Sequence, residues 1–195
     1  MTMEHQLDLV DALDVSIVRG AREQEEVTLK GRYDFECYDK DGNLKWKDVI
    51  DNVVCTVGKN VALDAFLAGS AYTVVGPFMG LISSVSYTTG PAVGDTMTSH
   101  AGWTEAGGLN APTYTAPRKT CAWSAATAGS KALSAALTFG ITATGQINGA
   151  FVVYGTGALS TIDNTAGILF SAGAFAAFKS VSNGDTLNVS YSLGM

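Results

Sequence analysis

The sequence predicts a mainly β protein, an antiparallel β-sandwich or jelly-roll-like domain with one short helix and an N-terminal arm. Apolar and polar residues alternate with a period of two in several short runs, as in half-buried strands. Glycine, proline, aspartate and asparagine lie between these runs and predict turns. In the body of the chain one segment, residues 58–68, carries a helical apolar stripe with a glycine after it. About seven to nine short strands separated in this way are typical of sandwiches and barrels.

The chain divides into an N-terminal arm, residues 1–26, and a β domain, residues 27–195. Apolar residues of the arm recur at spacings of three and four, which suits one or two helical turns, although the end of the arm fits an extended segment equally well. These apolar residues are Leu7, Val10, Leu13 and Ile17. Because so short a segment has little core of its own, we expect it to dock on another subunit, with disorder as the alternative.

The first element of the β domain is a predicted hairpin. Residues 29–37 alternate apolar and charged side chains, which predicts a strand with one buried and one hydrated face. Residues 39–43 predict a turn in which Gly42 takes a positive φ. Residues 44–54 return as the second strand. The helix predicted at residues 58–68 follows, and we expect it to plug or cover a sheet.

Short strands are predicted throughout the rest of the chain. Pro117 interrupts one of them, which suits an edge or a bend because proline lacks a backbone donor. The Ala-rich segments 122–136 and 172–177 are expected to be strand or loop, because glycine, serine and threonine lie among and beside their alanines. The predicted strands lie within residues 78–87, 113–124, 133–141, 149–154, 168–178 and 187–193.

Residues 90–112 are predicted to form a long irregular loop, and long loops in compact domains often carry function. The tripeptide Gly-Asp-Thr occurs inside this loop at residues 94–96 and again at residues 184–186. In both places we expect a turn that leads into a strand, with the aspartate accepting local backbone hydrogen bonds.

Charge is distributed very unevenly along the sequence. Residues 1–64 hold 14 acidic and 8 basic residues, so the net charge of −6 resides there. Residues 65–195 hold only 8 charged residues, about 6%, against roughly 25% in an ordinary soluble domain. Charge normally keeps a solvent-facing domain soluble and monomeric. We therefore expect neighbouring subunits to cover the surface of the body, with a soluble surface rich in Thr, Ser and Gly as the alternative.

Few residues of the sequence could perform chemistry. His5 lies in the arm, and His100 follows Ser99 without a GxSxG elbow. The few acidic residues of the body lie at turns, which disfavours the paired carboxylates of a glycosidase. The cysteines are Cys37, Cys55 and Cys121. Their odd number and wide spacing argue against a disulfide framework and a zinc site. We expect no enzymatic activity, no cofactor and no metal.

Nucleic acid and membranes are not expected partners. The sequence has no run of lysine and arginine that could neutralise phosphates. No stretch approaches the roughly 18 apolar residues of a membrane-spanning helix. The first 14 residues carry acids instead of the basic head of a secretory signal, so we expect synthesis in the cytosol.

Two neighbouring motifs lie in the predicted long loop, Gly-Asp-Thr-Met at residues 94–97 and Ser-His-Ala-Gly-Trp-Thr-Glu at residues 99–105. Together they resemble a signature of small structural proteins of tailed bacteriophages. In that family an arginine follows a tyrosine, as Arg118 follows Tyr114 here.

The resemblance extends over roughly residues 50–195. Residues 57–68 resemble the short helix of that family, and residues 78–83 resemble the strand before the motifs. A late Gly-Asp-Thr-Leu strand closes those chains, as residues 184–189 do here. The arm and the first hairpin lie outside the resemblance.

The resemblance implies a virion component, and it brings no catalytic residues. The leading hypothesis is a capsid cement or decoration protein, made in the host cytoplasm, that stabilises the head by binding the major capsid protein and copies of itself as a dimer or trimer. The alternative is a tail- or neck-associated fibre or receptor-binding protein, whose long loop contacts a ligand. The residues of the body that we predict at an interface are Tyr87, Met97, Trp103 and Tyr114.

Overall fold

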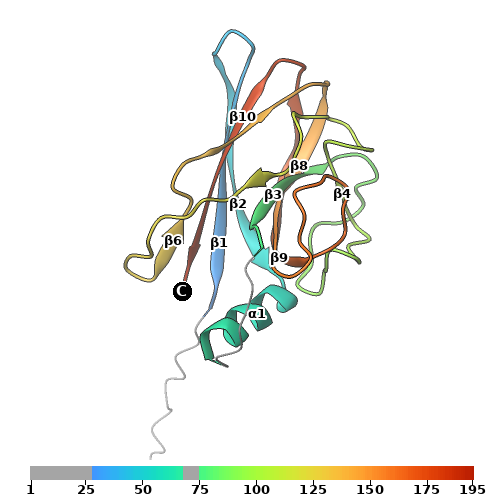
Figure 1. The fold of residues 1–195 in the computed structure, drawn as a ribbon. Helices are drawn as coiled ribbons and strands as arrows, with labels where there is room; N and C mark the ends of the chain where they lie inside the picture. Colours follow the sequence, from blue (N-terminus) through green and yellow to red (C-terminus); the bar gives the residue numbers. More distant parts are fainter. Residues whose placement is uncertain (1–27, 68–74) are drawn as a thin grey trace, which may run out of the picture.

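Figure 1 shows the computed structural model, which describes residues 28–67 and 75–195. The predicted arm, residues 1–26, lies outside the described residues, and with it the predicted interface residues Leu7, Val10, Leu13 and Ile17. The described part of the chain is mainly β with one short helix, so the predicted fold class is confirmed.

The first two strands form the predicted hairpin. Strand β1, Lys30–Tyr38, pairs antiparallel with β2, Leu44–Val54. Every second residue of β1 from Gly31 to Cys37 is buried, because the period of the apolar pattern equals the period of the strand. Gly42 in the turn has a φ of 85°, as predicted.

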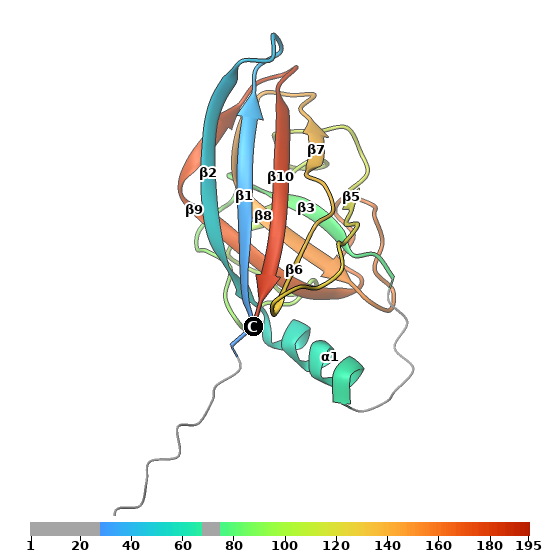
Figure 2. The same cartoon turned by 90° about the vertical axis from the view of Figure 1, so that its left-hand side faces the viewer.

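Helix α1, Thr56–Leu67, follows β2 after one residue and confirms the predicted helix, with a start two residues earlier. It lies at one end of the sandwich, against β9, Ile168–Val181 (Figures 1 and 2). A Cβ atom at Gly58 would lie 2.6 Å from the carbonyl oxygen of Phe170, so this close approach requires glycine. Leu63 remains 55% exposed, so the helix covers the end of a layer and does not plug the core.

Strands occur within all six of the runs predicted after residue 72. The run at residues 113–124 yields a strand of only two residues, since Pro117 cannot donate to a ladder. Both Ala-rich segments are strand and loop, as predicted. The remaining strands are β3 Phe78–Ser83, β4 Thr104–Glu105, β5 Lys119–Thr120, β6 Ser130–Ala132, β7 Leu137–Gly140, β8 Gly145–Tyr154 and β10 Thr186–Gly194.

The antiparallel strands fold into two layers. Their order is β4-β3-β8-β9-β2-β1-β10-β6, with β5 beside β3 and β7 beside β10. In Figure 2, β2, β1 and β10 lie side by side in front, and β8 and β9 cross behind them. Among the described strands, the layers share backbone pairs only at one corner, where Val53 and Val54 of β2 meet Ala172 and Ser171 of β9. The sheet therefore bends there and packs against itself as a sandwich.

Both open sides of the sandwich are bridged. On one side Thr115 donates its N–H to the carbonyl of Gly140 at the end of β7, and a few residues later β5 pairs with β3 in the other layer. On the other side the indole N–H of Trp46 donates to the carbonyl of Ser180 at 3.0 Å. Backbone bridges the first side, whereas on the second side a side chain spans β2 and β9 away from the corner where their backbones pair.

Hydrophobic residues form one core between the layers and a second cluster outside the back layer. Phe35 and Val189 of the front layer meet Leu81 and Val152 of the back layer in the core. The second cluster surrounds Trp103 and covers the outer face of β8. Strand β8 is consequently buried on both faces. The predicted long loop supplies this outer cover, which places its motifs in contact with the sheet.

Candidate functional site

The two Gly-Asp-Thr tripeptides form the same turn. In the first, Asp95 Oδ2 accepts the N–H of Ala92 at 3.0 Å and the indole N–H of Trp103 at 2.9 Å. In the second, Asp185 Oδ2 accepts the N–H of Ser182 at 2.7 Å. The N–H of each aspartate donates to the carbonyl three residues earlier at 3.0 Å. The prediction that these aspartates accept local backbone hydrogen bonds is confirmed.

Trp103 anchors the long loop to the sheet. Its side chain is 2% exposed, and its ring lies 5.4 Å from that of Phe151 on β8. The imidazole of His100 stacks on the indole at 4.0 Å, and its Nδ1 lies 3.0 Å from the carbonyl oxygen of Trp103. His100 therefore packs within its own loop.

A buried ion pair joins the last residue of the second motif to the arginine that follows it. Arg118 Nε donates to Glu105 Oε1 at 2.7 Å, and Arg118 Nη2 donates to Oε2 at 2.6 Å. The guanidinium also donates to the carbonyl oxygens of Leu159 and Asn164 at 3.0 and 2.6 Å. It lies 5.3 Å from the centre of the Phe151 ring. One arginine thus ties the strands to the loop after β8.

Burial determines the electrostatics of this pair. Desolvation raises the pKa of Glu105, while hydrogen bonds and charge from Arg118 oppose the rise. Burial also raises the pKa of the neighbouring Tyr114 hydroxyl. A carboxylate in such surroundings keeps its charge only with a partner that compensates for lost water. The pair is therefore a structural element of the loop.

The same network holds the tip of the loop between β4 and β5. Glu105 Oε2 accepts the N–H of Asp163, and Asp163 Oδ2 accepts the N–H of Leu109, both at 2.8 Å. The side-chain amide of Asn110 donates to the carbonyl of Glu105 at 3.1 Å. Sequence reasoning missed Asp163, because 54 residues separate it from Leu109 and no local pattern connects them.

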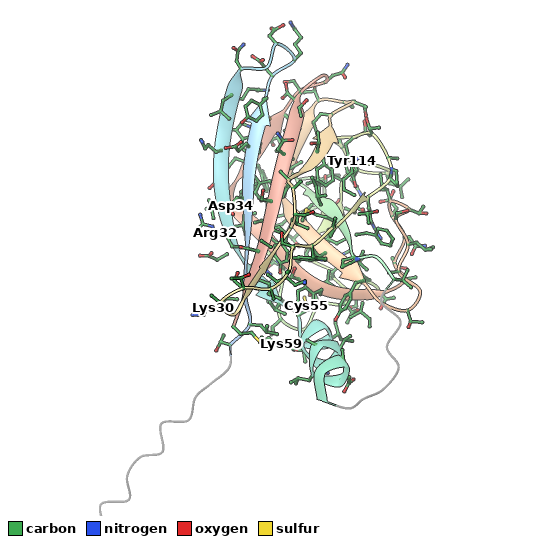
Figure 3. All side chains as sticks on the ribbon, turned by 60° about the vertical axis from the view of Figure 1, so that its left-hand side comes forward. Lys30, Arg32, Asp34, Cys55, Lys59 and Tyr114 are labelled. Atoms are coloured by element: carbon green, nitrogen blue, oxygen red, sulfur yellow. The ribbon has the colours of Figure 1, made fainter. Side chains whose placement is uncertain are left out.

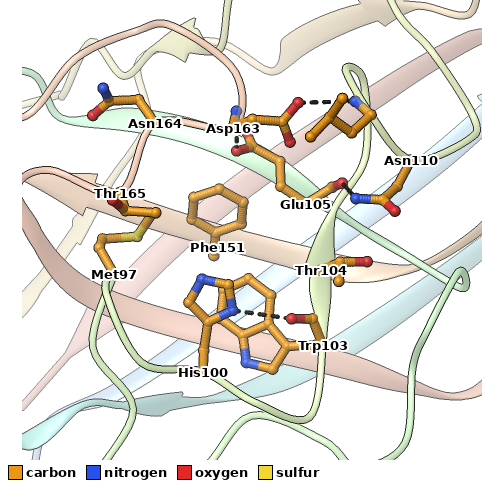
Figure 4. A pocket seen from close by; sticks show the side chains of 11 residues that line it. Met97, His100, Trp103, Thr104, Glu105, Asn110, Phe151, Asp163, Asn164 and Thr165 are labelled. Carbon is orange, nitrogen blue, oxygen red and sulfur yellow. Dashed lines mark hydrogen bonds between the residues drawn. The ribbon is translucent and has the colours of Figure 1, made fainter.

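Figure 4 shows a pocket of about 210 Å³ beside this tip. Its walls combine aromatic and apolar side chains with polar groups of the network. Several of those polar groups already have partners within the chain, as the Asp163 carboxylate and the Asn110 amide do. The lining residues are Met97, His100, Trp103, Thr104, Glu105, Leu109, Asn110, Phe151, Asp163, Asn164 and Thr165.

Three of the four interface residues predicted in the body are core residues. Met97 and Trp103 belong to the cluster over β8, and Tyr114 belongs to the core between the layers. Each is at most 3% exposed, so almost no surface remains for a partner, and the prediction is wrong for these three. Tyr87 is half-buried, and its ring packs edge-on at 5.7 Å against that of Phe178, which is exposed. Tyr87 remains a candidate contact.

The outer face of the hairpin is polar. Lys30, Arg32 and Asp34 line the outer face of β1 (Figure 3), and Arg32 forms an ion pair with Asp34 at 3.1 Å. Glu36 on the same face pairs with Lys47 of β2 at 3.3 Å. This face therefore offers charged and hydrogen-bonding groups to a partner.

The three cysteines are free and buried. Burial raises the pKa of Cys37 to about 11 and the pKa values of Cys55 and Cys121 to about 12. Thiols of this kind are poor nucleophiles and poor metal ligands. Across the described residues, no group of three or more His, Cys, Asp and Glu side chains could hold a metal ion.

No protein-family model, curated protein or solved structure matches this chain. No helix within residues 28–67 and 75–195 is long and apolar enough to cross a membrane.

Proposed function

We propose that this chain is a structural protein of a tailed-bacteriophage virion, a capsid cement or decoration protein that binds the major capsid protein on the outer face of the head. It acts without catalysis and without a cofactor. The observation that carries the proposal is the charge distribution, in which a charged arm and hairpin precede a body with almost no charge.

The fate of the few charged residues in the body supports a structural role. All four acidic residues after residue 65 accept hydrogen bonds within loops or turns of the chain itself. They are Asp95, Glu105, Asp163 and Asp185. Each of these carboxylates therefore has a structural role in its own loop or turn. Residues of the two motifs at 94–97 and 99–105 hold the long loop against the sheet.

The proposed mechanism is thermodynamic linkage. A protein that binds only the assembled shell shifts the equilibrium towards that shell by RT ln(1 + [L]/Kd), about 2.7 kcal/mol per site at a hundredfold excess over Kd. Equivalent sites over the whole shell multiply the effect. The polar outer face of β1 and β2 suits a polar partner such as the capsid surface, and the charge-poor body suits contacts between copies.

Binding to shells that lack the protein tests the proposal. The purified chain is expected to saturate such shells at hundreds of copies and to raise the temperature at which they disassemble. A variant with Lys30→Glu and Arg32→Glu, which reverses the charge on the polar face, should bind these shells more weakly. Copy numbers of only a few per particle would instead favour the alternative, a tail- or neck-associated fibre or receptor-binding protein.

The arm provides a second test of the same proposal. Removing residues 1–26 is expected to leave the β domain folded, because the described strands pair only with one another. The shortened chain should bind shells more weakly, since the arm is proposed to reach across neighbouring capsid subunits. Full occupancy of shells by the shortened chain would contradict this role of the arm.

A further inference from the structure

The outer face of β1 carries its charges in a definite order. Every second residue from position 30 points away from the core, because successive side chains of a strand alternate between its two faces. Two bases are followed by two acids, in the order Lys30, Arg32, Asp34 and Glu36. The side chains of Arg32, Asp34 and Glu36 are 53%, 45% and 43% exposed, so a partner can reach them (Figure 3).

The strands on either side of β1 complete a face whose charges cancel. Asp51 of β2 lies opposite Arg32 in the register, and Lys47 of β2 lies opposite Glu36. The side chains that β10 presents on this face are uncharged, at positions 186, 188, 190 and 192. Over residues 30–36 and 47–51, the outward side chains therefore comprise three bases and three acids. A face without net charge does not repel a copy of itself.

A two-fold rotation that reverses the strand direction brings opposite charges of this face together. When the axis crosses the layer at Tyr33, positions at equal distances before and after Tyr33 lie over one another. Lys30 of one copy then lies over Glu36 of the other. Arg32 of one copy lies over Asp34 of the other. Each contact occurs twice, because the rotation makes the two copies equivalent, so four ion pairs form between them.

The flanking strands permit the same arrangement. Under this rotation Asp51 lies over Val49 of the other copy, and Lys47 lies over Val53. No like charges of these two strands are thus set directly opposite each other. A rotation that kept the strands parallel would place Lys30 over Lys30 and every other charge of β1 over itself. The order of the charges therefore selects the antiparallel arrangement.

We propose that two copies of this chain associate in solution through this face, with β1 of one copy packed antiparallel on β1 of the other. Three strands of nine residues cover about 430 Å² on each copy, so the contact buries roughly 900 Å² in total. An area of this size is typical of weak, reversible contacts. Charge complementarity determines the orientation of such a contact more than its strength.

The inference deepens the proposed function and rests on it in one respect. The same face is proposed to bind the shell, so a shell must displace the second copy before it can bind the first. The free chain thus covers its polar face until a shell is present. The dimer itself does not depend on the capsid, and it is measured without shells.

Sedimentation equilibrium of the full chain at low salt tests the inference. The unmodified protein is expected to dimerise reversibly, and added salt should raise the dimer Kd because it screens exposed charges. Lys30→Glu combined with Arg32→Glu makes all four outward charges of β1 negative. This variant should raise the dimer Kd at least about tenfold, because four ion pairs are replaced by repulsion. Asp34→Lys combined with Glu36→Lys makes the four charges positive and should have the same effect.

Mixing the two variants gives the sharpest test. Each alone is expected to be largely monomeric, whereas an equimolar mixture should form a heterodimer, because four negative charges then face four positive ones. The matched control reverses an exposed ion pair at the hairpin turn, outside the proposed contact, by Lys40→Asp combined with Asp41→Lys. Its dimer Kd should not change. Near-UV circular dichroism of all variants should match the unmodified chain, because the changed side chains are exposed or half-buried.

Three outcomes would overturn the inference: a monomer at every concentration up to about 1 mM, a dimer that the charge-reversed variants leave intact, and no association when the two variants are mixed. A dimer with the expected charge dependence that does not bind shells would refute the capsid function alone. Shell binding by a chain that stays monomeric in solution would refute this inference alone.

Discussion

The β1–β2 hairpin and the body after α1 use charge in opposite ways. In the hairpin, Glu36 and Lys47 form an ion pair whose side chains are 43% and 64% exposed. In the body, the side chains of Glu105 and Arg118 are 7% and 0% exposed, and they form hydrogen bonds with three backbone groups. Exposed pairs contribute little to stability, whereas a buried pair becomes costly once one partner is lost.

The comparison explains how a nearly uncharged body still depends on its charges. The hairpin has many charges, and its exposed pairs, Arg32–Asp34 and Glu36–Lys47, are replaceable because water solvates them. The body has few charges, and its acids hold loops whose backbone groups would otherwise lack partners. Substitutions at matched positions in the two regions should therefore differ in effect.

The largest effect is expected from Glu105→Gln. It leaves the Arg118 guanidinium buried and unpaired, which should lower the free energy of unfolding by about 3–5 kcal/mol in urea titrations. Glu36→Gln in the hairpin is the matched control, and it should cost at most about 1 kcal/mol.

A double variant separates the pair from its surroundings. Glu105→Gln combined with Arg118→Met should be less destabilising than the sum of the two single variants, because no charge remains buried alone. Strict additivity would show that the two side chains act independently, and the comparison of the two regions would then fail.

An intermediate effect is expected at the two Gly-Asp-Thr turns. Asp185→Ala and Asp95→Ala each leave a backbone donor without its acceptor, a loss of about 1–3 kcal/mol. The cost should be greater at Asp185, because this residue is more deeply buried and also binds the ammonium of Lys45 at 2.5 Å. The urea midpoints of both variants measure the difference. Equal losses would mean that burial does not determine the strength of the turn.

Each region contains a buried cysteine, Cys37 in the hairpin and Cys121 in the body, and their thiols should respond alike to pH. Unfolded cysteines lose their protons near about pH 8.5, whereas folded Cys37 has a pKa of about 11 and Cys121 one of about 12. The folded state thus favours the neutral thiol, and stability should fall as the pH rises above about 8.5. At neutral pH a disulfide reagent should modify the native chain far more slowly than the chain in urea. Rapid modification of the native protein would contradict the burial of these thiols.

The smallest effect is expected at the side of the sandwich. Lys179 lies 2.5 Å from Asp48 and lowers the pKa of that carboxyl group. A depressed pKa stabilises the fold above the unfolded value near about 4, and the contribution disappears as the pH falls through the folded value. Asp48→Asn should therefore reduce the unfolding midpoint slightly at neutral pH. A difference that grows towards pH 3 would have the opposite sign and would refute this assignment.

The sequence predicts best where structure depends on neighbouring residues. The hairpin, α1 and the two Gly-Asp-Thr turns follow from local periodicity, from glycines with positive φ and from short-range hydrogen bonds. Aromatic residues of the long loop could not be assigned in this way. Whether Trp103 faces a partner or β8 depends on Phe151, which is 48 positions away along the chain.

The sequence by itself determined the fold class, all the strands except β4 and β6, and the division between a charged N-terminal part and a charge-poor body. These properties depend on the period of the side chains and on composition. Only the tertiary structure decided that Met97, Trp103 and Tyr114 are core residues. It also brought Glu105, Arg118 and Asp163 into one network, because contacts between distant segments form when the sheet bends into two layers.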